Sequence, residues 1–96
     1  MTHNTFDKIL NATYMREQLH KARNTFMEHC VQCLDEMEAE DPCFNGVTHF
    51  HLRFATRKAV FMASDASGVR PRDVYRLLGG EEGAFDIIAR LRGGLS

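Results

Sequence analysis

One stretch of the chain, VTHFHLRFATRKAVFMASDA at residues 47–66, most constrains the fold because it is compatible with two different structures. If it forms one helix, its large apolar residues fall close together on one face, and these are Val47, Phe50, Phe54 and Phe61. Smaller or flexible apolar residues widen that face, namely Ala55, Ala59, Met62 and Ala66. The opposite side of the helix would then carry His49, Arg53 and Arg57.

The alternative for this stretch is a β-hairpin over about residues 49–63. Alternate residues from Phe50 to Phe54 are apolar, as on the inner face of a strand, and the chain would return after Thr56-Arg57-Lys58. That turn lacks the Gly, Asn or Asp that tight hairpins use for positive φ. Gly68 stands just past the stretch, where a glycine commonly ends a helix. We therefore predict a helix, and an α+β fold with the hairpin is the alternative.

The stretch from residue 15 to residue 37 predicts a long amphipathic helix. Its apolar residues recur at spacings of three and four: Met15, Leu19, Ala22, Phe26, Cys30, Cys33 and Met37. The element is expected to begin between Thr5 and Thr13, and a short leading helix over residues 6–11 could precede it. It should end before Asp41-Pro42, because the residue before a proline is disfavoured in a helix.

The length of this helix bears on the oligomeric state. At 1.5 Å per residue it would measure about 40 Å, more than the width of so small a domain. Part of its apolar stripe would then need a second chain. We predict a homodimer whose interface contains Met15, Leu19, Ala22 and Phe26. The alternative is an antiparallel helical hairpin within one chain.

Two short helices are expected near the C-terminus. Pro71 suits the first turn of a helix that runs to Leu78 and is closed by Gly79-Gly80. Two glutamates then favour the start of a last helix, which ends in basic residues at Arg92. The predicted fold is all-α, a single domain over residues 1–96 with one long N-terminal helix, a central helix and two short C-terminal helices.

Composition places the chain among folded, water-soluble proteins. Hydrophobic residues make up 44% and charged residues 26%, which is ordinary for a globular domain. No apolar run approaches the roughly 20 residues of a membrane-spanning helix. The start, MTHNTFDKIL, lacks the basic and apolar regions of a secretory signal, so we expect a cytoplasmic protein.

Three cysteines, an odd number, indicate reduced thiols or metal ligands more than a disulfide framework. Cys30 and Cys33 lie one helical turn apart, and a tetrahedral zinc site could be completed by Cys43 with either His49 or His51. Because Cys30 and Cys33 fall on the apolar stripe, buried structural thiols are the simpler interpretation. Apart from this zinc, no cofactor is expected.

Charge is unevenly distributed along the chain. Residues 1–45 carry eight acidic and four basic residues, a net charge of −4, whereas residues 46–96 carry eight basic and five acidic residues, a net charge of +3. The C-terminal half could present one cationic patch, formed by Arg53, Arg57, Arg70, Arg72 and Arg76. Such a patch is expected to bind an acidic partner.

The sequence predicts a non-enzymatic protein. His29 and Cys33 are spaced to touch on a helix, but no third group or oxyanion site accompanies them. We expect a small helical adaptor, inhibitor or regulatory partner, of a kind that mobile elements could encode, which acts by binding another protein.

The alternative function is a dimeric, helix-turn-helix-like DNA-binding regulator built on residues 71–91. Against it, the helix that would read DNA carries Glu81, Glu82 and Asp86, which phosphates repel.

Overall fold

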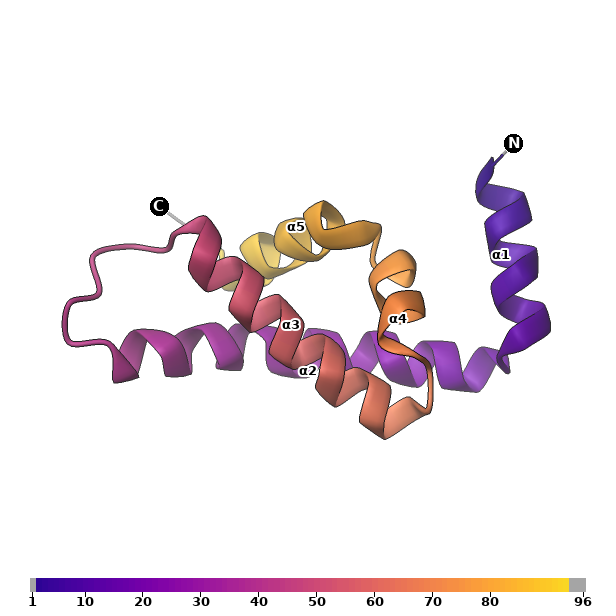
Figure 1. Cartoon of the computed structure of the whole chain (residues 1–96), viewed down its shortest axis with the longest axis horizontal. Coiled ribbons are helices and arrows are strands. Elements are labelled where there is room, and N and C mark those ends of the chain that lie inside the picture. Colours follow the sequence, from indigo (N-terminus) through magenta and orange to yellow (C-terminus); the bar gives the residue numbers. More distant parts are fainter. Residues whose placement is uncertain (1, 94–96) are drawn as a thin grey trace.

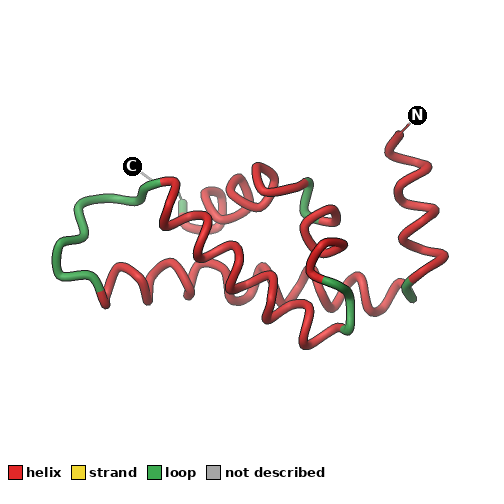
Figure 2. Tube along the Cα trace, in the orientation of Figure 1, coloured by secondary structure: helices red, strands yellow, loops and turns green. Residues whose placement is uncertain are grey.

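Proline or glycine stands at each break between helices after residue 40, whereas the first break, at Tyr14 and Met15, has neither. The computed structural model describes residues 2–93, with side chains from residue 8 onward. In this part the helices are α1 (Thr2–Thr13), α2 (Arg16–Glu40), α3 (His49–Ser67), α4 (Pro71–Leu77) and α5 (Gly80–Arg92), as Figure 1 shows. No strand occurs among the described residues (Figure 2), so the all-α prediction is confirmed and the hairpin alternative is wrong.

The N-terminal element is divided in two at Tyr14 and Met15. A leading helix was predicted over residues 6–11, and α1 is longer than that. Met15 has an extended backbone, with φ −68° and ψ 146°, and its N–H is capped by the side chain of Gln18. Figure 1 shows α1 standing away from the other helices, whereas α2 runs along the length of the molecule.

The main contact of the fold is between α2 and α3. On α3 the buried positions include Ala55, Ala59 and Ala63, spaced one turn apart. Opposite them α2 buries Leu19, Ala22, Phe26, Cys30, Cys33 and Leu34. Because alanine lets two helix backbones approach closely, the bulk of this core comes from α2.

The predicted apolar face of α3 is therefore wrong in part. Phe50, Phe54 and Phe61 were expected to face the core, but all three are exposed, and so is Ala66. Sequence patterning gave weight to the largest side chains, whereas close packing against α2 selects the smallest ones. Glycine at position 68 ends α3 as predicted, with a left-handed φ of 79°.

The C-terminal helices pack back on α2 and α3. Ala84 and Ile88 of α5 are fully buried. The corner between α4 and α5 needs Gly83, since a Cβ at this position would lie 2.1 Å from the carbonyl oxygen of Leu78. Near its end α5 is tied to α2, where Arg92 Nη2 lies 2.5 Å from Glu38 Oε2. Within the described residues no helix is both long and apolar enough to cross a membrane.

Candidate functional site

The outer face of α3 carries a row of exposed aromatic side chains. The side chains of Phe50, Phe54 and Phe61 are 62%, 51% and 49% exposed. Spacings of four and seven residues place them on one side of the helix, turned away from the alanines that contact α2. We call these three residues the phenylalanine row.

Ring contacts hold the first half of this row in place. The rings of Phe50 and Phe54 have centroids 4.7 Å apart and are tilted by 43°. The ring centroid of His51 lies 5.9 Å from that of Phe50 and 4.9 Å from that of Phe44 in the preceding loop. His51 is itself fixed by the N-terminus of α3, because its Nδ1 accepts a hydrogen bond from the Thr48 N–H at 3.0 Å. Aromatic rings held in this way lose little conformational freedom on binding a partner.

Cationic side chains lie beside the phenylalanine row on the same helix. Arg53, Arg57 and Lys58 are exposed. Arg57 was predicted on the side opposite the phenylalanines, but it follows Phe50 by seven residues and shares its solvent-facing side.

Two of these cations have exposed partners. Arg53 Nε is 3.6 Å from Glu81 Oε2, and Lys58 Nζ is 3.3 Å from Glu36 Oε2, a hydrogen bond that raises the pKa of Lys58. Exposed pairs of this kind are screened by solvent and contribute little to stability. Arg57 has no ion pair within 4 Å among the described residues.

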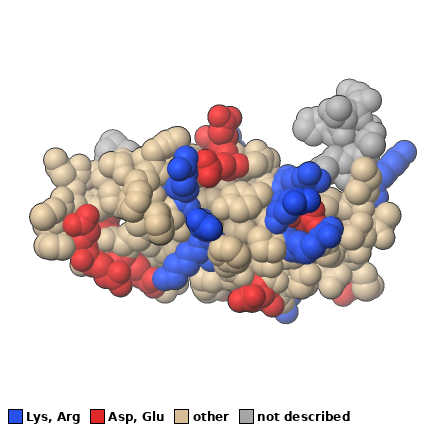
Figure 3. Space-filling view, viewed as in Figure 1, with Lys and Arg blue, Asp and Glu red and all other residues tan. Residues whose placement is uncertain are grey.

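The remaining predicted cations lie over α4. In Figure 3 two groups of Lys and Arg side chains stand out on the viewed face, one over α3 and one over α4, with mostly uncharged surface between them, and further basic atoms lie at the right-hand edge of the molecule. The single patch expected from the sequence is thus divided. Arg72 and Arg76 are exposed at the α4 end.

Arg70 has a structural role instead. Its Nε donates to the hydroxyl of Tyr14 at 2.8 Å, and this hydroxyl donates to Asp73 Oδ2, also at 2.8 Å. Burial by itself raises the pKa of Asp73, but the hydrogen bonds from Tyr14 and Arg70 outweigh it and hold this pKa below its usual value. The network joins the α1–α2 junction to the start of α4.

The predicted oligomer interface is mostly inside one chain. Leu19, Ala22 and Phe26 are buried within the chain, and only Met15 is exposed, at 69%. The antiparallel pairing of α2 with α3 covers the stripe for which a second chain was expected.

The structure does not bring the five predicted metal ligands together. Among the described residues no three His, Cys, Asp or Glu side chains are grouped so that they could hold a metal ion. Cys30 and Cys33 are buried, whereas Cys43 is exposed in the loop after α2. Cys33 and the end of α2 are seven residues apart, roughly 10 Å along the axis.

The two buried thiols are also unsuited to nucleophilic chemistry. Burial raises the pKa of Cys30 to about 11, and burial likewise raises the pKa of Cys33. A thiol of this kind is protonated at neutral pH, when the thiolate is the reactive form.

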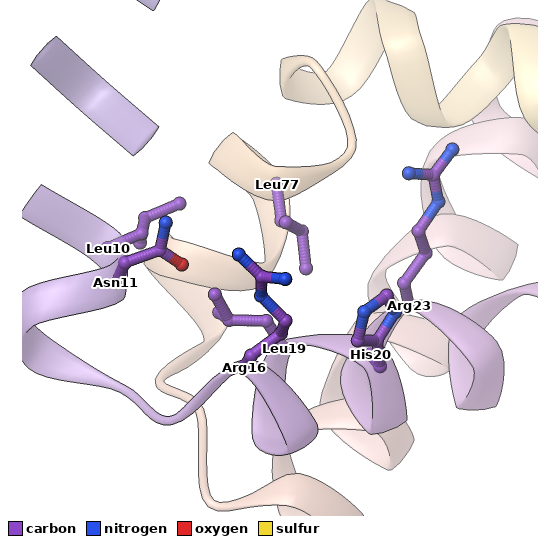
Figure 4. A pocket seen from close by; sticks show the side chains of 7 residues that line it. All are labelled: Leu10, Asn11, Arg16, Leu19, His20, Arg23 and Leu77. Carbon is purple, nitrogen blue, oxygen red and sulfur yellow. The ribbon is translucent and has the colours of Figure 1, made fainter. Parts of the chain in front are cut away.

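Sequence reasoning missed a basic notch at the junction of α1, α2 and α4. Three leucines line it, Leu10, Leu19 and Leu77, and the side chains of Arg16, His20 and Arg23 lie along it (Figure 4). The signal was present as three basic residues at spacings of four and three. In the net charge of residues 1–45 these bases are outweighed by the six acidic residues of 27–45.

Comparisons with models of known protein families, with curated proteins and with solved structures give no match to this chain.

Proposed function

We propose that this protein is a non-enzymatic interaction module that binds an acidic segment of another protein through the outer face of α3. The observation that carries the proposal is the exposure of the phenylalanine row beside Arg53, Arg57 and Lys58. Aromatic residues and arginine are the types most enriched at the energetic centres of protein interfaces.

The core of the fold does not need the phenylalanine row. The contact between α2 and α3 is made by the opposite side of α3, through Ala55, Ala59 and Ala63. Three large apolar side chains in water on one side of one helix are unusual for a monomeric protein unless they serve binding. This argues for a partner that covers them.

Charge supports an acidic partner. The cations beside the row are held only by exposed ion pairs, or, for Arg57, by none within the described residues. An amphipathic helix with leucines on one side and carboxylates at its margins would match both the apolar row and these cations. Attraction between the two surfaces would increase the association rate at low salt.

A protein partner suits this face better than DNA. Glu81 and Glu82 are exposed in the first turn of α5, and Glu81 is paired with Arg53 beside the row. These carboxylates would repel any anion close to them, so the preference for a protein rests on the phenylalanine row, which apolar side chains of a protein can cover and a phosphate backbone cannot. The DNA-binding alternative remains as an outcome of the test.

The proposal is tested with a synthetic amphipathic helix of leucine and glutamate, labelled for fluorescence anisotropy, and with its leucine and lysine counterpart. We expect the acidic peptide to bind and the basic one not to bind. The double variant Phe54→Ser, Phe61→Ser should abolish binding, and Arg57→Glu should slow association in a salt-sensitive way. Leu91→Ser, which removes an exposed apolar side chain from α5, is the matched control and should bind normally.

Capture from the native host followed by mass spectrometry then identifies the partner. Proteins retained by the wild type and by Leu91→Ser, but lost with the double variant, are the expected result. The proposal is contradicted if the double variant retains the same proteins, or if a DNA duplex binds more tightly than the acidic peptide with a steep salt dependence. It is also contradicted if sedimentation shows a dimer that the double variant converts to a monomer, since the row would then be covered by a second copy.

A further inference from the structure

The notch at the junction of α1, α2 and α4 is separate from the outer face of α3. Its apolar floor is formed by one leucine from each of the three helices, Leu10, Leu19 and Leu77. Leu10 and Leu19 are buried and Leu77 is half-buried. Figure 4 shows Arg16 beside this floor and Arg23 farther along α2, with His20 between them.

The three basic side chains share one side of α2. Arg16, His20 and Arg23 follow each other at spacings of four and three, and all three are exposed. No ion pair to any of them occurs among the described side chains. Residues 1–26 hold four basic and two acidic residues, whereas residues 27–45 hold six acidic and no basic ones. The notch therefore lies at the cationic end of a polarised helix.

The helix itself does not favour this charge order. The N-terminus of a helix is a region of positive potential, where anions are stabilising and cations are not. Arg16 nevertheless occupies the first position of α2, although Glu17 beside it suits the dipole, and the last turn of α2 has no basic residue. Arg16 and Arg23 border an apolar notch and have no ion pair within 4 Å among the described side chains, so both are available to a ligand that carries negative charge.

The size of the notch indicates the kind of ligand. Its volume is about 220 Å³. Sites for whole small molecules occupy about 300 to 1,000 Å³, so this notch is smaller than such a site. It suits one large side chain of a longer molecule.

We propose that the notch receives a single leucine-like side chain from an acidic segment of a partner protein, whose carboxylates flank that side chain and pair with Arg16 and Arg23. This inference extends the proposed function in one respect only, that the partner is an acidic protein. It concerns different residues, so the two can fail separately.

Binding at the notch should also affect α1. This helix has 12 residues, and helices of that length are only marginally stable unless packed. In α1, Leu10 is buried but the adjacent Ile9 is 58% exposed. A side chain seated against Leu10 would add to the contacts that hold α1 on α2, and amide hydrogen exchange over residues 8–13 should slow.

The probe is a capped heptapeptide with one leucine between two runs of three glutamates, titrated into the labelled full chain and followed by NMR. We expect saturable shifts of the methyl groups of Leu10, Leu19 and Leu77, with slower exchange in α1. Replacing the leucine of the peptide by alanine should weaken binding about tenfold, in line with the loss of most of one apolar side chain.

Variants of the protein distinguish specific pairing with Arg16 and Arg23 from a general effect of net charge. The double variant Arg16→Glu, Arg23→Glu should weaken binding of the heptapeptide at least about tenfold, since two attractions become repulsions. Lys21→Glu is the matched control, an exposed residue of α2 that does not line the notch, and it should bind almost normally. All these side chains are exposed, so an unchanged circular dichroism melt should accompany each variant.

Two results would overturn the proposal. One is equal binding of the leucine and alanine peptides, or no methyl shift at saturating peptide, which would remove the apolar anchor. The other is that Lys21→Glu weakens binding of the heptapeptide as much as the double arginine variant does.

The variant Phe54→Ser, Phe61→Ser should still bind the heptapeptide, and the Arg16→Glu, Arg23→Glu variant should still bind the amphipathic helix. If the protein binds only one of the two peptides, the proposal that concerns the other peptide fails.

Discussion

The two faces of α3 use apolar residues in opposite ways. The inner face presents Ala55, Ala59 and Ala63 to α2 and is fully covered, whereas the outer face presents Phe50 and Phe54 to water. Side-chain size accounts for the difference, because small residues let two helices approach and large ones hold them apart. On α3, burial follows the fit to α2 more than hydrophobicity, and the large aromatic side chains of the outer face are left exposed.

The largest expected effect separates two phenylalanines. Phe26 of α2 is fully buried, and Phe26→Ala should lower the free energy of unfolding by about 3 to 5 kcal/mol, since it removes a large side chain and leaves a cavity. Phe61→Ala on the outer face should cost less than about 1 kcal/mol. Urea denaturation followed by circular dichroism measures both. A similar decrease in the free energy of unfolding for both variants would mean that the outer face of α3 also stabilises the fold.

A second comparison uses the thiols of the inner face. Because the pKa of Cys30 is raised from 9.0 to about 11, the unfolded chain ionises this thiol first as pH rises. Stability is therefore kept below about pH 9 and falls between pH 9 and 11, by up to about 3 kcal/mol for two pKa units. The slope of stability against pH in this range should shrink in Cys30→Ala.

Exposed Cys43 should react with a thiol reagent at pH 8 far faster than Cys30 or Cys33.

A third comparison tests the close approach of the helices directly. Ala59→Leu inserts three carbon atoms into the contact between α2 and α3 and should cost about 1 to 3 kcal/mol. Ala66→Leu makes the same change at an exposed position of the same helix, and its effect should stay within about 0.5 kcal/mol. Thermal denaturation distinguishes the two. A neutral Ala59→Leu would show that α3 can move away from α2 without loss.

Local signals in the sequence were enough to predict the helices. Asp41 precedes Pro42 and ends α2, Gly68 ends α3, and Pro71 begins α4. These residues act on their own backbone, so their effect does not depend on the rest of the fold. The existence and type of the elements could therefore be predicted without tertiary contacts.

The faces of the helices could not be predicted in the same way. Whether Phe54 or Ala55 is buried depends on how closely α2 approaches, which periodicity does not contain. The predicted zinc ligands are not grouped among the described residues for a similar reason. Placing Cys43 near Cys30 requires a loop geometry that the chain does not adopt. The notch depends on three helices meeting at Leu10, Leu19 and Leu77, a contact between distant parts of the sequence.

The smallest expected effect concerns one hydroxyl on the inner face. Thr56 is fully buried on α3, and its Oγ1 has no hydrogen-bond partner among the described residues. Thr56→Val replaces this hydroxyl by a methyl group of nearly the same shape and removes the cost of burying an unpaired polar atom. It should therefore raise the free energy of unfolding by about 1 kcal/mol.

The matched control makes the same substitution at the N-terminus of the helix. Thr48 caps α3, and its Oγ1 accepts a hydrogen bond from the N–H of His51. Thr48→Val removes that cap and should lower stability by about 0.5 to 2 kcal/mol. One chemical change on one helix should thus give opposite signs, and urea denaturation of both variants measures them. Destabilisation by Thr56→Val would mean that the hydroxyl has a partner in solution, and that the inner face of α3 is less tightly closed than its alanines indicate.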